Sequence, residues 1–191
     1  TYDAGTDTFT VAAGTGDRLT FGGFGASRTA LRRGQFESFV DPAGVVTAVA
    51  AWTGDGRIAE TRATAGGVTE SYLYAYGTTG GSFGQLTAAT LRRSTDGGAT
   101  WATVRSVEYA YYGTGEAHGN RGDLKTATVR DAAGAALSTD YYRYYQPGEA
   151  GGYVHALKFA VTGASYDRLA AAVGDVAAAA DAALGPYANH Y

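Results

Sequence analysis

The chain has 191 residues, a size that fits one domain or one section of a repeat array, and 45% of them are hydrophobic. Charged residues make up 17% and the formal net charge is −3, which argues against disorder and gives no electrostatic reason to expect nucleic acid or an anionic membrane as partner. Cysteine is absent, which excludes disulfides and thiolate metal sites, and no apolar run reaches the ~20 residues of a membrane span.

Glycine and tyrosine are unusually frequent, with 29 Gly and 15 Tyr against only 3 Pro. Many glycines indicate many turns, and tyrosine favours the half-buried surface of a pleated strand. The composition therefore predicts a mainly β protein in which short strands are joined by tight connections.

Residues 1–35 form the first section, and the segment GDRLTFGGF at 16–24 is its clearest strand signal. We interpret this section as degenerate N-terminal strands. The chain starts at Thr1 without Met, so we expect it to be a processed product or a piece of something larger.

Aromatic residues two positions apart mark the strands of the central section, 36–145. A period of two places side chains on one face of a strand, whereas a helix would scatter them around its axis. We expect rings on neighbouring strands to form a structural aromatic ladder, in which each pair adds roughly 0.5–1.5 kcal/mol beyond the burial of area. The predicted ladder residues are Trp52, Tyr72, Tyr74, Tyr76, Tyr109, Tyr111, Tyr142 and Tyr144.

The central section also repeats a larger unit, made of an aromatic strand, a Gly-rich loop, a Gly-x-Leu strand and a Gly turn. Gly-x-Leu occurs at 84–86 and again at 122–124. The unit recurs every roughly 25–38 residues because the loops differ in length. Repetition of this kind predicts an antiparallel strip of hairpins that spirals as a β-sheet.

One turn of this section, STDGGATW at 94–101, fits the Asp-box pattern of sialidase-like propellers at five positions, namely Ser94, Asp96, Gly98, Thr100 and Trp101. A sialidase needs several such boxes together with an arginine triad, and one box is present. We therefore interpret the segment as a turn in which Asp96 accepts backbone N–H groups, the glycines adopt positive φ and Trp101 caps the hairpin.

The last section, 146–191, is predicted to be a loop followed by one helix over approximately 165–184. Ser165 is the expected N-cap and Gly185–Pro186 the expected stop. An apolar stripe along the helix predicts that it docks on a sheet. Residues 186–191 are expected to start another strand.

Three segments resemble the YD-repeat, or RHS-repeat, family: FVDPAGVVTAVAAW (39–52), WTGDGRIAETRATAGGVTESYLYAY (52–76) and GDLKTATVRDAAGAALSTDYYRYY (122–145). The family consensus is an aromatic–Asp dipeptide, then Gly-Arg-Leu, a strand and a glycine. The copies here are degenerate, because the dipeptide is intact as Tyr2–Asp3 while Trp52–Thr53 or Tyr76–Gly77 stands in its place elsewhere.

The resemblance implies a long β-sheet strip that forms a shell or rod, in a large bacterial protein that is extracellular or on the cell surface. Such a strip has open sheet edges at both ends, and open edges pair with other strands. We therefore expect flanking YD repeats or other copies of the chain as partners, so that a homopolymer is one expected assembly. The signature of the terminal RHS autoprotease is not found in the sequence.

Other short patterns offer weaker candidates for chemistry. Arg-Gly-Asp at 121–123 matches an integrin-recognition tripeptide, but it falls where a strand is expected to open. The three histidines are far apart and lack metal-ligand spacing, and no cofactor motif is present, so we expect neither a metal nor a cofactor. The carboxylates considered for glycoside hydrolysis are Glu60, Glu70, Glu108, Asp96, Asp131 and Asp140.

The sequence thus favours a non-catalytic structural segment of an extracellular repeat protein, serving as shell, stalk or filament subunit. The alternatives are a carbohydrate-binding or adhesive module that uses exposed Tyr and Trp faces, with glycans as partners, and a degraded glycosidase.

Overall fold

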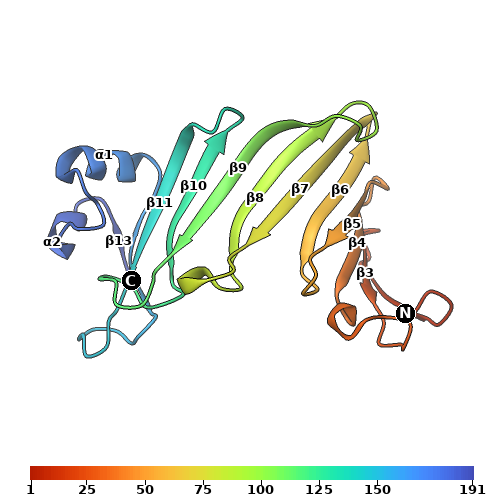
Figure 1. The fold of residues 1–191 in the computed structure, drawn as a ribbon, viewed down its shortest axis with the longest axis horizontal. Coiled ribbons are helices and arrows are strands. Elements are labelled where there is room, and N and C mark those ends of the chain that lie inside the picture. The colour runs from red at the N-terminus through yellow and green to blue at the C-terminus, as the bar shows by residue number, and fades with distance from the viewer. The chain divides into compact units, whose positions relative to one another are not determined.

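The computed structural model describes all 191 residues, and strands make up most of its regular structure (Figure 1). The strands are β1 (Tyr2–Asp3), β2 (Thr8–Ala12), β3 (Arg18–Gly22), β4 (Phe36–Val40), β5 (Val46–Trp52), β6 (Ile58–Ala65), β7 (Val68–Tyr76), β8 (Leu86–Ser94), β9 (Ala102–Tyr111), β10 (Leu124–Asp131), β11 (Ala136–Tyr144), β12 (Leu157–Val161) and β13 (Asn189–His190). Two 3₁₀ turns, Ala30–Arg32 and Gly80–Ser82, lie in loops.

The strands form one 13-stranded antiparallel sheet in which every strand neighbours the strand before it in the sequence. Register pairs such as Thr10 with Thr20 and Thr128 with Thr139 define this meander. The prediction of a mainly β, antiparallel hairpin strip with a C-terminal helix is confirmed.

One tight turn recurs at four hairpins, 13–17, 41–45, 53–57 and 131–135. In each, the first N–H bonds to the fifth carbonyl at 2.8–3.1 Å, and the N–H of a glycine at the fourth position bonds back to the first carbonyl at 3.0–3.1 Å. These four glycines have φ between 84° and 98°, a region that favours glycine. Asp41, Thr53 and Asp131 also accept the fifth N–H with their side chains.

A second, wider connection also recurs four times, at 22–35, 77–85, 112–123 and 145–156. The first N–H of each loop bonds to the last carbonyl at 2.8–2.9 Å, and the last N–H bonds to the carbonyl three residues earlier. The next-to-last residue has positive φ, and it is Gly34, Gly84, Gly122 or His155. Each wide loop ends directly before a strand, which explains the Gly-x-Leu spacing seen in the sequence.

The chain divides into two compact units. The N-terminal unit comprises 1–74 and 90–104, and the C-terminal unit comprises 75–89 and 105–191. In the N-terminal unit the buried positions of the sheet carry polar side chains, among them Glu60, Thr61, Thr69, Ser71 and Ser94.

The C-terminal unit holds the hydrophobic core. Two helices, α1 (Ala164–Val173) and α2 (Asp181–Leu184), lie beside β11 and β13 (Figure 1). The core consists of Tyr141, Phe159, Val161, Leu169, Val176 and Leu184. Docking of the helical segment on the sheet therefore creates the main apolar interior.

The prediction of a single helix over 165–184 is wrong in one respect. The structure has two helices in this region, α1 and α2, separated by a non-helical stretch. Gly174, with φ of 74°, ends α1, and Asp175 then accepts the N–H groups of Ala177 and Ala178. Ser165 lies inside α1, whose N-cap is Gly163, so the expected N-cap was also wrong. Neither helix has the length and apolar character that a membrane span requires.

Candidate functional site

The structure distributes the eight aromatic ladder residues over strands that are not neighbours. Tyr109 of β9 lies opposite Ala127, and Tyr111 opposite Leu124, both on β10. That strand therefore separates the tyrosines of β9 from Tyr142 and Tyr144 of β11. Tyr142 lies opposite Ala160 of β12. Small or aliphatic residues thus face the rings on the strands next to them.

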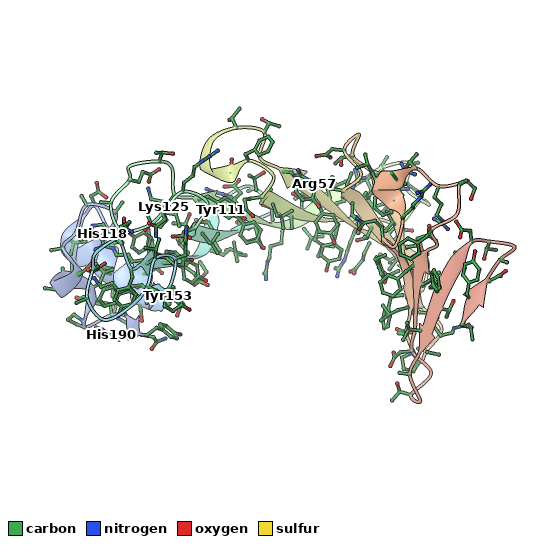
Figure 2. The ribbon with its side chains drawn as sticks, turned by 90° about the horizontal axis from the view of Figure 1, so that it is seen from below. Arg57, Tyr111, His118, Lys125, Tyr153 and His190 are labelled. Atoms are coloured by element: carbon green, nitrogen blue, oxygen red, sulfur yellow. The ribbon has the colours of Figure 1, made fainter.

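Several ladder residues instead contact groups outside the ladder. Tyr144 packs edge-on against Tyr112, with ring centroids 6.3 Å apart. The guanidinium of Arg32 lies over Trp52 at 5.3 Å. Tyr111, labelled in Figure 2, donates to the carbonyl of Leu86 at 2.7 Å. The hydroxyl of Tyr74 bonds to that of Thr61, while Tyr72 and Tyr76 project from the same strand, β7.

The Asp-box segment forms a turn closed by its own side chains. Ser94 donates to Asp96 at 2.6 Å, and Thr100 donates to the same carboxylate through its hydroxyl and its backbone N–H. The backbone N–H of Gly98 bonds to Ser94, with φ of 95° at that glycine. Hydrogen bonds from Ser94 and Thr100 hold the pKa of Asp96 well below its usual range.

The tryptophan of this turn covers two arginines of the sheet. Trp101 lies 4.2 Å from the guanidinium of Arg92 and 5.1 Å from that of Arg62. Both arginines bond to the buried carboxylate of Glu60, at 2.8 Å and 2.7 Å, and Ser71 donates to the same carboxylate at 2.5 Å. Sequence reasoning had treated Trp101 and Glu60 separately, and the structure brings them into one cluster.

Glu60 is held ionised in this cluster. Burial raises the pKa of its carboxyl, but the hydrogen bonds from Arg62, Ser71 and Arg92 outweigh burial and lower the pKa to about 2. A carboxylate that is saturated with donors is a poor proton carrier, so the cluster is suited to joining strands β6, β7 and β8.

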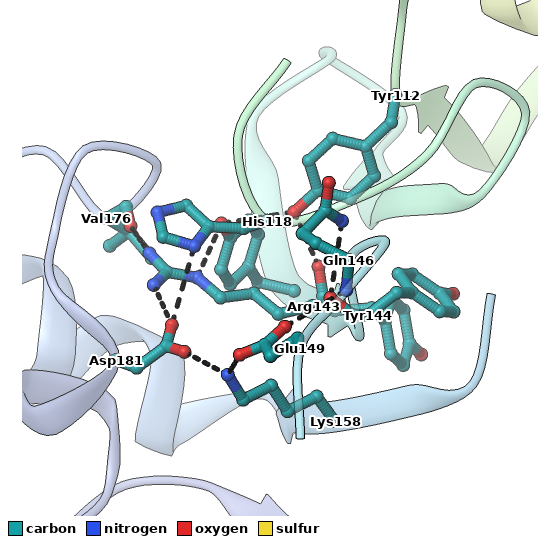
Figure 3. A network of polar contacts seen from close by, with 11 residues as sticks. Tyr112, His118, Arg143, Tyr144, Gln146, Glu149, Lys158, Val176 and Asp181 are labelled. Carbon is teal, nitrogen blue, oxygen red and sulfur yellow. Dashed lines mark hydrogen bonds and ion pairs between the residues drawn. The ribbon is translucent and has the colours of Figure 1, made fainter. Parts of the chain in front are cut away.

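The second polar cluster surrounds Arg143 in the C-terminal unit (Figure 3). This arginine is fully buried, and it donates to the hydroxyl of Tyr141 at 3.0 Å, to Asp181 at 2.6 Å and to the carbonyl of Val176 at 2.9 Å. His118 lies 3.4 Å from the same oxygen of Asp181. Arg143 therefore ties β11 to the segment between α1 and α2.

Next to Arg143 is a cavity of about 420 Å³, lined by His118, Arg143, Tyr144, Gln146, Pro147, Gly148, Glu149, Lys158 and Asp181. Lys158 of β12 contacts Asp181 Oδ2 at 2.5 Å and also Glu149 Oε1. Burial raises the pKa of Asp181, but hydrogen bonds from Lys158 and Arg143 outweigh it, so the net shift is downward. The charged groups that line this cavity come from β11, β12, α2 and two wide loops.

Two of these wide loops are copies of each other. The segments Tyr-Gly-Thr-Gly-Glu-Ala at 112–117 and Tyr-Gln-Pro-Gly-Glu-Ala at 145–150 are each followed by Leu-Lys, at 124–125 and 157–158. Glu116 accepts the N–H of Gly113 and pairs with Lys125, as Glu149 accepts the N–H of Gln146 and pairs with Lys158. In both copies the lysine also lies over the ring of the first tyrosine.

Sequence reasoning missed Arg143, Glu149, Lys158 and Asp181. The repeated Gly-Glu-Ala and Leu-Lys steps were a readable signal for Glu149 and Lys158, because the chain has only two lysines. No sequence signal pointed to Asp181, since it joins the cluster only through the docking of α2.

The remaining candidates take part in local contacts. In the Arg-Gly-Asp tripeptide, Arg121 donates to the carbonyl of Gly80, and Asp123 contacts Asn120 and His155. His190 packs against the ring of Phe159.

The carboxylates considered for hydrolysis are also engaged. Glu70 pairs with Arg93 and Glu108 with Arg130. Asp140 accepts the N–H of Gly163, and Asp131 closes a tight turn. The arrangement favours a structural use of these charges.

No protein-family model matches this sequence, and the search of curated proteins gives no match.

Proposed function

We propose that the chain is a non-catalytic structural segment of an extracellular YD-like repeat protein, serving as part of a shell, stalk or filament. The observation that carries this proposal is the recurrence of two connections, the tight Gly turn and the wide loop, each four times in one meander. Repeat proteins gain stability from the repeats themselves and from the interfaces between neighbouring repeats.

The engagement of the charged residues supports the same proposal. The carboxylates of both polar clusters accept bonds from arginine, lysine or backbone N–H groups within their own cluster. Such groups join strands and loops. A hydrolytic site needs instead a carboxyl group that can exchange its proton with a substrate, and Glu60, whose pKa is lowered to about 2, is unsuited to that role.

The outer strands suggest where further units attach. β1 and β13 are two residues long and leave part of their neighbours unpaired. Unpaired strand edges bind other strands, so we expect the functional partner to be a flanking repeat or another copy of the chain.

Light scattering tests this expectation. The chain should associate with increasing concentration. Val11→Lys, on the part of β2 that lies beyond the two residues paired with β1, should reduce association, because charged side chains protect open edges. Val46→Lys is the matched control, since Val46 is similarly exposed but lies on β5, inside the sheet between β4 and β6 and away from the outermost strand. A folded wild-type chain that stays monomeric at all concentrations would contradict the filament version.

Carbohydrate binding is the second candidate, and one observation favours it. The rings of Tyr2, Phe9 and Phe24 are in contact, with centroids 4.8 Å and 5.8 Å apart, and all three are exposed. Glycan-array binding that is lost on Phe24→Ala but kept on Phe83→Ala, an equally exposed ring elsewhere, would support this function over the structural one.

A further inference from the structure

Lys158 lies between two carboxylates that come from different parts of the chain (Figure 3). Its Nζ is 2.5 Å from Asp181 Oδ2 and also contacts Glu149 Oε1. Glu149 belongs to the wide loop before β12, and Asp181 opens α2. The amine of Lys158, a potential nucleophile, therefore contacts an oxygen of each of two carboxylates.

The other oxygen of Asp181 is held by cationic or polar groups. Arg143 Nη1 is 2.6 Å from Oδ1, and His118 Nδ1 is 3.4 Å from it. Arg143 is fully buried and positioned by Tyr141 and Val176, so its charge stays directed at this oxygen. Fixed donors at a carboxyl oxygen stabilise the negative charge that develops there when a nucleophile attacks the carbon.

The lysine is largely withdrawn from water, with 18% of its side chain exposed. The rings of Tyr145 and Phe159 lie 5.5 Å and 5.7 Å from Nζ. Burial alone would lower the pKa of Lys158, but its bonds to Asp181 and Glu149 outweigh burial and raise it. The resting amine is thus protonated, and any reaction must begin by moving a proton to a neighbouring carboxylate.

We propose that Lys158 and Asp181 form an intramolecular amide bond, with Glu149 as the proton carrier and Arg143 as the group that stabilises the tetrahedral intermediate. The bond would fasten α2 to β12. This single-turnover modification goes beyond the structural role proposed above and does not depend on the repeat assignment.

The step balances without any co-reactant. The Lys158 ammonium gives a proton to Glu149, and the neutral Nζ forms a bond to Asp181 Cγ while the electron pair of the C–O bond moves to Oδ1 beside Arg143. Glu149 delivers that proton to Oδ2 and then carries a second one from nitrogen to the same oxygen. The C–Oδ2 bond breaks, one water leaves, and Glu149 ends as the carboxylate it was.

The first copy of the wide loop provides an internal control. Lys125 contacts Glu116 as Lys158 contacts Glu149, and it lies over Tyr112 as Lys158 lies over Tyr145. Its polar contacts include no counterpart of Asp181. The proposed reaction therefore belongs to Lys158 alone.

Intact-mass measurement of the denatured full-length chain tests the proposal. After incubation in the folded state at acidic, neutral and alkaline pH, the wild-type chain should weigh one water less than its sequence. Trypsin should then leave 144–168 joined to 169–191, since cleavage after Arg168 cannot separate segments that share the new bond.

Variants show whether a loss of water comes from the Lys158–Asp181 amide bond or from another reaction in the chain. Lys158→Arg keeps the positive charge but is not nucleophilic, so it should retain the full mass, whereas Lys125→Arg should still form the bond. Glu149→Gln should slow bond formation by about 10²-fold or more, the usual effect of a general acid–base group. Circular dichroism checks that each variant is folded.

Two results would overturn the proposal. The first is a folded wild-type chain that keeps its full mass at every pH. The second is a loss of water that persists in Lys158→Arg or leaves the two tryptic segments separate, because such a loss would come from another residue.

Discussion

The two units stabilise their parts of the sheet in different ways. In the C-terminal unit the helical segment covers β11 and β12, and the buried residues are mostly apolar, with Leu169, Val161 and Leu184 fully inaccessible to water. In the N-terminal unit, which contains no α-helix, the most buried side chains include Glu60, Ser71 and other polar groups. The comparison teaches that a sheet without a covering layer can shield side chains on its face from water through arginine–carboxylate and arginine–tryptophan contacts.

The largest effect is expected at Arg143, where the C-terminal unit also uses a buried charge. Arg143→Met removes a fully buried guanidinium and its hydrogen bonds to Tyr141, Asp181 and the carbonyl of Val176, and hydrogen bonds of a charged group contribute about 1.5–3 kcal/mol each. Urea unfolding followed by circular dichroism measures the change. Arg93→Met, which breaks the exposed pair with Glu70, should lower the free energy of unfolding by less than about 1 kcal/mol. If both variants lose the same free energy of unfolding, the buried contacts of Arg143 do not stabilise the C-terminal unit as proposed.

Leu169→Ala should show that apolar packing carries the C-terminal unit. The residue is fully buried on α1, and the loss of a buried leucine side chain costs about 2–5 kcal/mol in the free energy of unfolding. Leu19→Ala on β3 is the matched change in the N-terminal unit, where the side chain is 36% exposed, so its effect should be smaller. If both substitutions cost the same, the contrast between the units is wrong.

Acid should weaken the N-terminal unit through Glu60. Its pKa is lowered from 4.5 to about 2 in the folded chain, so its contribution is complete above pH 4.5 and is lost as the pH falls towards 2. The shift corresponds to at most about 3 kcal/mol. Hydrogen exchange of the backbone N–H groups of β6 and β7, followed from pH 5 to pH 2, measures the loss. This range spans the ordinary pKa of a glutamate and the lowered pKa of Glu60.

Glu60→Gln is the control for this pH dependence. The amide cannot ionise, so the variant should be less stable at neutral pH and its stability should change less with acid. A variant with the same pH dependence as the wild type would assign the effect to another group, such as Asp96.

The smallest effects are expected at the repeated tight turns, where the units should behave alike. Gly44 and Gly134 both have φ of 85°, and no atom within 4 Å would obstruct an added Cβ. Alanine at either position should therefore cost about 1 kcal/mol, through backbone strain alone. Gly14→Ala is the control, because that turn glycine has no positive φ.

Thermal unfolding of the three glycine variants measures these differences. The stabilities of Gly44→Ala and Gly134→Ala should differ by less than the stability of Gly14→Ala differs from that of the wild type. If they differ by more, the repeated turns are not equivalent, and the main support for the repeat proposal is lost.

Local features were the predictable part of this fold. Asp41 and Asp131, each followed three residues later by a glycine, are typical of tight hairpin turns, and the Gly-x-Leu steps predicted the ends of the wide loops. The break in the helix at Gly174 was missed, because alanine-rich flanks favour a continuous helix. Gly174 and Asp175 instead end one helix and form the next turn.

The positions of partners across the sheet were not predictable. The two-residue spacing of tyrosines was read correctly as strand, but ring contacts depend on which strand lies alongside. The register places Ala127 opposite Tyr109 and brings Tyr112 to Tyr144. The grouping of Trp101 with Arg62, Arg92 and Glu60 likewise joins residues far apart in the sequence.

The sequence by itself determined that this chain is an antiparallel meander, because turn chemistry and strand periodicity depend on residues only a few positions apart. Only the tertiary structure decided which charges are buried together. Asp181 meets Lys158 and Arg143 because α1 and α2 pack their apolar side chains against β11 and β12, and packing over that sequence distance leaves no pattern that the residues alone reveal.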